Sequence, residues 1–176
     1  MLDREKLSVQ ALLFDLDGTL LDSFEQYSRS LAAAMTDFGL QVPSRSCMRQ
    51  SMGGPGRETL RILGVPPEQV EPVHSRWVEW AWHVADSTHP FPGIVPLLER
   101  LGAAGYQLGI VTSRPRRSVD GTPAALELLP RVDVLVTRDD TAEGKPHPAP
   151  VLHALHCLGV SPEQCVYVGD VCYDMQ

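Results

Sequence analysis

Four short runs of the chain are mostly apolar and have the length of β-strands rather than helices. These runs are residues 11–14, 107–112, 132–136 and 165–169. A strand without regular polar alternation is buried on both faces, as in a parallel sheet that helices cover on both sides. Apolar residues with helical spacing supply the covering helices, at residues 95–101, 124–129 and 149–158. The sequence therefore predicts the α/β class with a parallel sheet.

The segment between the first and second runs contains helical spacing of apolar residues and no convincing strand. An N-cap signal at Asp22 and Ser23 begins its first helix, and Pro-Phe-Pro-Gly at residues 90–93 closes the segment. We therefore expect a single α/β core with an insertion after the first strand, rather than two domains in tandem. The core is expected to comprise residues 1–21 and 90–176, and the helical cap residues 22–89.

Composition excludes several classes of protein. The formal net charge of −7 and the lack of a basic run argue against nucleic acid as a partner. A membrane span needs about 20 consecutive apolar residues, which the sequence lacks, and the charged N-terminus does not resemble a secretory signal. The four cysteines form no CxxC pair, which indicates reduced thiols. We expect a cytoplasmic monomer or homodimer without nucleic-acid or membrane partners.

Polar residues follow the carboxyl ends of the predicted strands, where parallel sheets bind their ligands. Asp15 and Asp17 follow the first strand, Thr112 and Ser113 end the second, and Asp170 follows the last. Lys145 lies in the loop before the last helix, and Asp174 lies four residues beyond Asp170. The sequence therefore predicts a polar site at this edge of the sheet.

Four carboxylates gathered at one edge would repel one another unless a cation compensated them. Mg²⁺ suits such a cluster, because it binds a few carboxylates and completes its coordination with water and phosphate oxygens. Lys145 adds a further positive charge, and the combination suits phosphoryl transfer. Each motif alone has a structural explanation, such as a turn at Asp15-Leu-Asp17-Gly18 or a helix N-cap at Asp170. Their occurrence in order, each at its own strand end, favours a catalytic site.

These motifs resemble those of the haloacid dehalogenase superfamily. The similarity comprises Asp15-Leu-Asp-Gly-Thr-Leu-Leu-Asp-Ser23, Val111-Thr112-Ser113, Lys145-Pro146 and Val168-Gly-Asp170-Val-Cys-Tyr-Asp174. The insertion is similar to the helical cap of the phosphoglycolate phosphatase and β-phosphoglucomutase branch. The resemblance implies a Rossmann-like core in which Asp15 attacks phosphorus and Asp17 is the general acid and base.

The resemblance also implies roles for the remaining polar residues. Thr112 would donate a hydrogen bond to the phosphoryl group, and Lys145 would neutralise both the nucleophile and the phosphate. Asp170 would coordinate Mg²⁺ together with Asp15 and the carbonyl of Asp17. Asp174 would contribute to the metal site through water or by orienting Lys145. Ser113 would contact the substrate.

The expected activity is Mg²⁺-dependent hydrolysis of a phosphate monoester of a small metabolite through an aspartyl-phosphate. A phosphomutase of the same superfamily and a catalytically silent binding protein are the alternatives. Arg49 and Arg57 flank the glycine-rich loop at residues 53–56. They are candidates to bind a carboxylate or second phosphate of the substrate, and the alternative is that both are solvated helix ends.

Two further expectations concern the connections of the cap and the end of the chain. The connections near residues 21–24 and 88–93 are expected to act as hinges. Members of the superfamily continue beyond the fourth motif, whereas this sequence ends two residues after Asp174. We expect either a C-terminally shortened form, with residues 165–169 at an uncovered sheet edge, or a partner that covers this edge.

Overall fold

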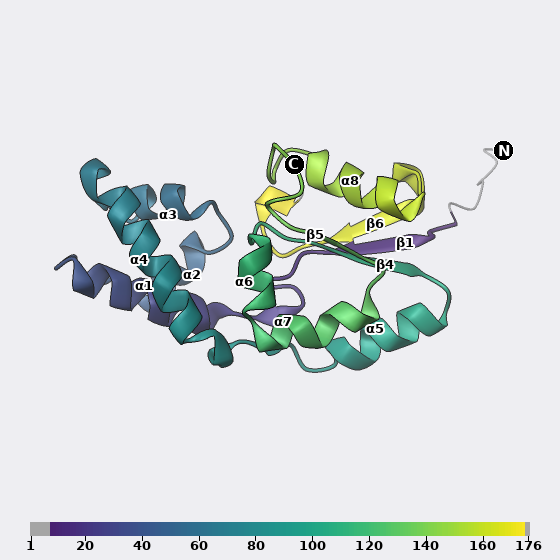
Figure 1. The fold of residues 1–176 in the computed structure, drawn as a ribbon, viewed down its shortest axis with the longest axis horizontal. Helices are drawn as coiled ribbons and strands as arrows, with labels where there is room; N and C mark the ends of the chain where they lie inside the picture. The colour runs from purple at the N-terminus through teal and green to yellow at the C-terminus, as the bar shows by residue number, and fades with distance from the viewer. Residues whose placement is uncertain (1–7, 175–176) are drawn as a thin grey trace.

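The computed structural model describes residues 8–174. Its core is a four-stranded sheet in the order β5-β4-β1-β6, and all neighbouring strands are parallel (Figure 1). The strands are β1 (Ala11–Phe14), β4 (Gln107–Val111), β5 (Val134–Val136) and β6 (Cys165–Val168). Phe14 is in register with Ile110 on one side and with Val168 on the other. The predicted α/β class with a parallel sheet is confirmed.

The third predicted strand begins two residues later than expected, at Val134 rather than at residue 132. Asp133 accounts for the difference, because both its side chain and its backbone bond to Leu108 near the start of β4. Its carboxylate accepts the N–H of Leu108 at 2.8 Å, and its own N–H donates to the carbonyl of Leu108 at 2.7 Å. These bonds hold the chain in a turn before β5 starts.

Helices cover both faces of the sheet (Figure 1). One face is covered by α5 (Ile94–Ala103), α6 (Arg116–Asp120) and α7 (Pro123–Leu128), and the other by α8 (Ala149–Leu158). Leu98, Ile110 and Leu128 are fully buried on the first face, and Leu13 and Ala154 on the second. Short 3₁₀ turns occur at Pro67–Gln69, Ala85–Ser87, Leu129–Arg131, Pro162–Gln164 and Cys172–Asp174.

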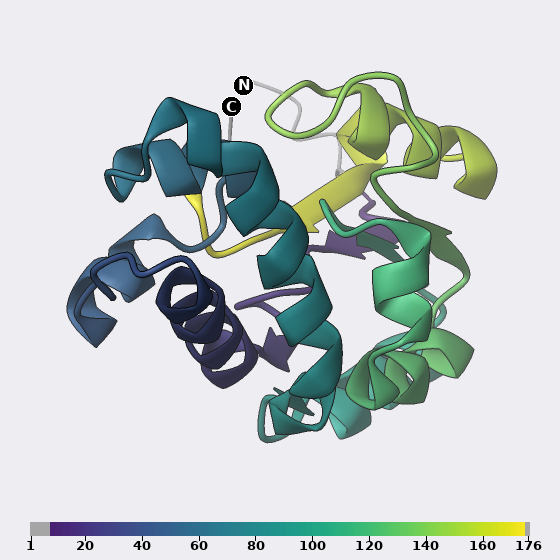
Figure 2. The same ribbon diagram turned by 60° about the vertical axis from the view of Figure 1, so that its left-hand side comes forward.

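The inserted segment folds into a helical unit with its own hydrophobic core. It contains α1 (Phe24–Asp37), α2 (Arg45–Ser51), α3 (Gly56–Ile62) and α4 (Val70–His83). Figure 2 brings this cap to the front, with α4 running along α1. Leu31, Leu60 and Val73 are fully buried between the helices. At the start of α1, the carboxylate of Asp22 accepts the N–H of Phe24 at 3.4 Å, whereas Ser23 makes no side-chain cap.

The cap and the core are joined by a two-stranded antiparallel ribbon that the sequence analysis did not predict. It is formed by β2 (Leu21–Asp22) and β3 (His89–Pro90), and it corrects the expectation that the segment as far as residue 90 contains no strand. Strands of two residues are too short to produce a periodic pattern in the sequence. The two connections of the cap therefore lie side by side and are paired with each other.

β6 lies at the edge of the sheet among the described residues, as the sequence analysis expected. Val166 and Val168 are 42% and 38% exposed there. Within residues 8–174, no helix is both long enough and apolar enough to cross a lipid bilayer.

Gly109 in β4 provides a test of how closely side chains from neighbouring strands pack in the sheet. A Cβ atom at this position would overlap the side chains of Leu13 and Val134 on the neighbouring strands. Gly109→Ala is therefore expected to lower the free energy of unfolding by about 1–3 kcal/mol, measured by chemical denaturation. Gly102→Ala, in an open position of α5, is the matched control and is expected to cause no loss. Equal losses in both variants would contradict this packing.

Candidate active site

The predicted polar residues meet at the carboxyl ends of the strands. Asp15 follows β1, and its N–H donates to the carbonyl of Val168 at 2.9 Å. Thr112 follows β4, and its N–H donates to the carbonyl of Val136 at 2.9 Å. Asp15 and Thr112 are only 6% and 4% exposed, so the sheet fixes both residues in a buried position.

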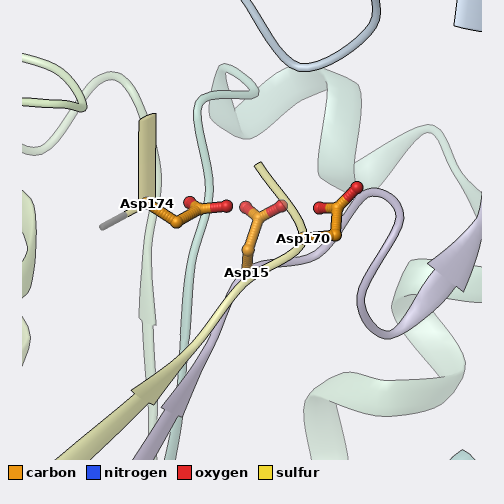
Figure 3. A group of neighbouring side chains, drawn as sticks. All are labelled: Asp15, Asp170 and Asp174. Atoms are coloured by element: carbon orange, nitrogen blue, oxygen red, sulfur yellow. The ribbon is translucent and has the colours of Figure 1, made fainter. Parts of the chain in front are cut away.

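Asp15, Asp170 and Asp174 form a cluster in which one oxygen from each carboxylate lies within 4.8 Å of the others. Figure 3 shows Asp15 between the other two side chains, which come from the loop and turn after β6. Gly18 is required for this approach, because a Cβ atom there would overlap the carboxylate of Asp170. Thr19 donates its hydroxyl to Asp170 at 3.3 Å. The turn at residues 15–18 therefore packs closely against the loop that carries Asp170.

Lys145 neutralises part of this cluster from a buried position. Its ammonium donates to Oδ1 of Asp15 at 2.6 Å and to Oδ1 of Asp174 at 2.7 Å. The third bond goes to the hydroxyl of Tyr167 at 3.2 Å, so all three N–H groups have partners. The Lys145 side chain is only 7% exposed. Its two ion pairs are therefore well shielded from water.

The pKa values of the site follow from burial and from these charges. Burial, with smaller contributions from Asp17 and Asp174, raises the pKa of Asp15 to about 7, although the ammonium of Lys145 acts to lower it. Burial also raises the pKa of Asp170. Burial and the surrounding carboxylates raise the pKa of Tyr167 well above its ordinary value, so its phenol stays protonated and can donate to Asp174.

Asp17 has a different partner from the other carboxylates. Arg114 donates from Nε and Nη2 to its two carboxylate oxygens, each at 2.6 Å. Burial acts to raise the pKa of Asp17, but the guanidinium of Arg114 outweighs that effect and holds the pKa below its ordinary value. Asp17 therefore forms a separate ion pair beside the cluster.

Arg114 and Tyr167 contact the predicted site residues but were not predicted from the sequence. A signal for Arg114 was available, because it is a basic residue two positions beyond Thr112 at a strand end. Tyr167 gave no such signal, because it lies within the apolar run of β6 and resembles any other core residue in the sequence. Its hydroxyl contacts both Lys145 and Asp174.

Two adjoining cavities open between the cap and the strand ends. The first, here called the carboxylate cavity, has a volume of about 260 Å³ and is lined by Asp15, Asp17, Thr112 and Lys145 from the core. The second, here called the side cavity, has a volume of about 420 Å³. Its polar lining includes Arg57, His74, Ser113, Arg117 and Arg138, with no carboxylate among the lining residues. The cap contributes Gly53, Gly56 and His74 to both cavities.

Of the predicted substrate-binding residues, some line these cavities and others do not. Ser113 is exposed and lines both of them. Arg57 lines the side cavity, but its guanidinium makes a bidentate ion pair with Glu71, with both distances 2.7 Å. Arg49 lines neither cavity and stacks on Phe24, with its Cζ atom 3.9 Å from the ring centroid. The structure thus brings Ser113 and Arg57, but not Arg49, to the cavities.

A buried aspartate, a lysine and an acidic cluster at the carboxyl edge of a parallel sheet place this chain in the class of capped α/β enzymes. The sequence profile of the family described as haloacid dehalogenase-like hydrolase matches residues 12–176. This match covers nearly the whole chain. The chain belongs to the haloacid dehalogenase-like hydrolase family.

Individual relatives agree with this assignment. The chain is 30% identical to an N-acetylmuramic acid 6-phosphate phosphatase of Pseudomonas aeruginosa over 98% of its own length and 78% of the relative's. It is 34% identical to a phosphoglycolate phosphatase of Xanthomonas campestris pv. campestris, over 92% of its own length and 74% of the relative's.

Solved structures show the same fold. A haloacid dehalogenase-like family hydrolase from Streptococcus pneumoniae superimposes with a TM-score of 0.84 at 28% identity, over 96% of this chain and 79% of that one. The structure of CbbY from Rhodobacter sphaeroides in complex with phosphate gives a TM-score of 0.75 at 25% identity, over 94% of this chain and 79% of that one. The Rossmann-like core with surrounding helices is confirmed.

The buried ammonium of Lys145 provides a test of the electrostatics. Lys145→Met would leave Asp15 and Asp174 buried without their cation, and it is expected to lower the free energy of unfolding by about 3–5 kcal/mol. The measurement is chemical denaturation at pH 8 with a metal chelator present. Arg116→Met, which removes an exposed ion pair with Asp120, is the control and is expected to change stability little. A loss no larger than that of the control would contradict the assigned role of Lys145.

Proposed function

We propose that the protein is a Mg²⁺-dependent phosphatase that hydrolyses a phosphate monoester of a small metabolite through an aspartyl-phosphate on Asp15. The main support is the setting of Asp15 in the carboxylate cavity. Lys145 binds Oδ1 of this carboxylate, whereas Oδ2 accepts no hydrogen bond from any residue between 8 and 174. One oxygen is thus held in place while the other remains available as the nucleophile.

In the first step, Oδ2 of Asp15 attacks phosphorus, and the bond between phosphorus and the ester oxygen breaks. The departing oxygen takes a proton from Asp17, so that an alcohol leaves. Because Arg114 favours the ionised carboxylate, Asp17 must take up this proton from solvent before the step. The ammonium of Lys145 offsets negative charge on the phosphoryl oxygens. Thr112 accepts the N–H of Arg114 at 3.1 Å, which leaves its hydroxyl proton for a phosphoryl oxygen.

In the second step, a water molecule attacks phosphorus, and the bond to Oδ2 of Asp15 breaks. Asp17, now ionised, accepts a proton from the water as the new bond forms. Inorganic phosphate leaves, and both carboxylates return to their starting forms. Asp17 lines the same cavity as Asp15, which is the position that both proton transfers require.

The residues at this site fit a magnesium ion. Three carboxylates and one ammonium leave excess negative charge, and their oxygens are the hard donors that Mg²⁺ prefers. Asp15 and Asp170 would hold the ion together with the carbonyl of Asp17. Asp174 already accepts bonds from Lys145, Tyr167 and the N–H of Val171, so it would act mainly by orienting Lys145. When bound, the ion would supply positive charge that stabilises the transferring phosphoryl group.

The side cavity favours an organic phosphate that carries a second anionic group. Several arginines line it without any carboxylate, and Arg57 among them remains a candidate for this contact. Similarity to proteins named phosphoglycolate phosphatase and N-acetylmuramic acid 6-phosphate phosphatase makes phosphoglycolate and N-acetylmuramic acid 6-phosphate the first esters to test. Arg49 would reach substrate only after leaving its contact with Phe24.

A panel of phosphate esters, assayed with and without Mg²⁺, tests the proposed activity. Metal-dependent release of inorganic phosphate supports the phosphatase. Transfer of the phosphoryl group to a second position on a sugar phosphate would indicate a phosphomutase instead. Binding without turnover of any ester by the folded protein would indicate a catalytically silent binding protein.

Replacement of the nucleophile gives a sharper result. Asp15→Asn retains the size of the side chain but loses the anion, so phosphate release is expected to fall by several orders of magnitude. Thermal unfolding of the same sample verifies that the variant is folded. Residual turnover above about a tenth of the wild-type rate would exclude Asp15 as the nucleophile.

The pKa of Asp15 predicts how metal binding depends on pH. The ion binds the ionised carboxylate, so below a pKa of about 7 it must displace a proton. The apparent affinity for Mg²⁺ is expected to fall by about tenfold per pH unit below that pKa and to level off above it, as measured by calorimetric titration. Asp17→Asn retains its backbone carbonyl but removes a charge that raises the pKa of Asp15, so its profile is expected to keep this shape and to move to lower pH. Affinity that does not change between pH 5.5 and 8 would contradict this expectation.

A further inference from the structure

Arg114 is bonded to more than its ion-pair partner. Its Nη1 donates to the hydroxyl of Thr122 at 2.9 Å, and its Nη2 donates to Oε1 of Gln26 at 2.8 Å as well as to Asp17. A guanidinium has five N–H donors, and this geometry directs its donors in three different directions. The side chain is 15% exposed, so little water competes for these bonds. Arg114 is therefore held in one orientation by residues of both the core and the cap.

Gln26 extends this network into the cap. It lies on α1 and is 5% exposed. Its Nε2 donates to the carbonyl of Ala81 on α4 at 2.9 Å, and its Oε1 accepts the hydroxyl of Thr88 at 2.9 Å. Thr88 directly precedes β3, the strand by which the chain returns from the cap. One amide group thus connects Arg114 with both long cap helices and with the return connection.

We propose that Arg114 is the positioning residue for Asp17, and that Gln26 links the orientation of Asp17 to the position of the cap. The inference rests on the proposed phosphatase activity, in which Asp17 exchanges protons with the leaving group and with water. The paired N–H donors of Arg114 fix the plane of the carboxylate, which a single donor could not do. These N–H donors occupy one lone pair on each carboxylate oxygen of Asp17 and leave the second lone pair of each oxygen for the reacting groups. Asp17 still lines the carboxylate cavity in this orientation.

The test compares Arg114→Lys with Asp17→Asn on two substrates, an alkyl phosphate and p-nitrophenyl phosphate. Lysine keeps the charge but cannot bind both oxygens of Asp17. Arg114→Lys is expected to lower kcat on the alkyl ester by about 10- to 100-fold with KM changed less than about threefold. The loss on the nitrophenyl ester is expected to be smaller, because that leaving group needs little protonation. Gln26→Met, which removes the link to the cap, is expected to reduce kcat less than Arg114→Lys.

A double variant separates positioning from a structural role. In the Asp17→Asn background, Arg114→Lys is expected to cause no further loss of kcat on p-nitrophenyl phosphate, because the group that it positions is already gone. If Arg114 had a purely structural role, Arg114→Lys would lower kcat equally on both substrates. In the Asp17→Asn background it would then lower kcat further, by the same factor as in wild type. Arg116→Lys, an exposed position in the same segment, is the matched control and is expected to match wild type. A folded Arg114→Lys enzyme with wild-type kcat on the alkyl ester would overturn the proposal.

The same variants distinguish failure of this inference from failure of the proposed function. If wild type hydrolyses the esters but Arg114→Lys behaves as described for a structural role, only the inference is wrong. If wild type hydrolyses none of the esters, the phosphatase assignment is wrong. The denaturation midpoints of the single and double variants then show whether Asp17 and Arg114 are energetically coupled. Non-additive shifts for Asp17→Asn and Arg114→Lys would support the link between the two side chains, and additive shifts would overturn it.

Discussion

The buried ammonium of Lys145 is the interaction on which the carboxyl edge of the sheet depends. It binds carboxylates that come from two separate places, Asp15 after β1 and Asp174 in the turn after β6. Without this cation, the two carboxylates would lie buried and mutually repelling at the ends of adjacent strands. Lys145 itself comes from the loop between β5 and α8, so the ammonium also connects the far strand of the sheet with its centre. Charge neutralisation and positioning of the proposed nucleophile, Asp15, are thus the same interaction.

The sequence predicted the sheet, and it predicted that several polar residues meet at one edge of it, because both features depend on local patterns. Continuous apolar runs reveal buried strands, and polar motifs at their ends reveal Asp15, Thr112 and Asp170. The β2–β3 ribbon escaped prediction, since pairs of residues have no periodicity. Helix α2 has only Met48 buried and therefore shows no apolar spacing, although Ser44 caps it by accepting the N–H of Cys47 at 3.2 Å.

The sequence could not reveal which charged residues form ion pairs with one another. Arg57 was a candidate for substrate, yet it pairs with Glu71 on the neighbouring helix α4. Arg114 was overlooked, yet it pairs with Asp17, which lies 97 positions away in the chain. Such contacts depend on how separate elements pack, and residue type and local spacing do not record that packing. The same holds for Gln26, which appears in the sequence as an ordinary polar residue on an amphipathic helix.

The β2–β3 ribbon has a consequence for the architecture of the whole chain. Because Leu21 pairs with Pro90 and Asp22 with His89, the polypeptide leaves the core and returns to it at neighbouring points. An insertion whose two ends are adjacent adds no strain to the host sheet, whatever its length. A change in the length of the segment between these strands therefore need not alter the strand order of the sheet, because the two attachment points stay paired.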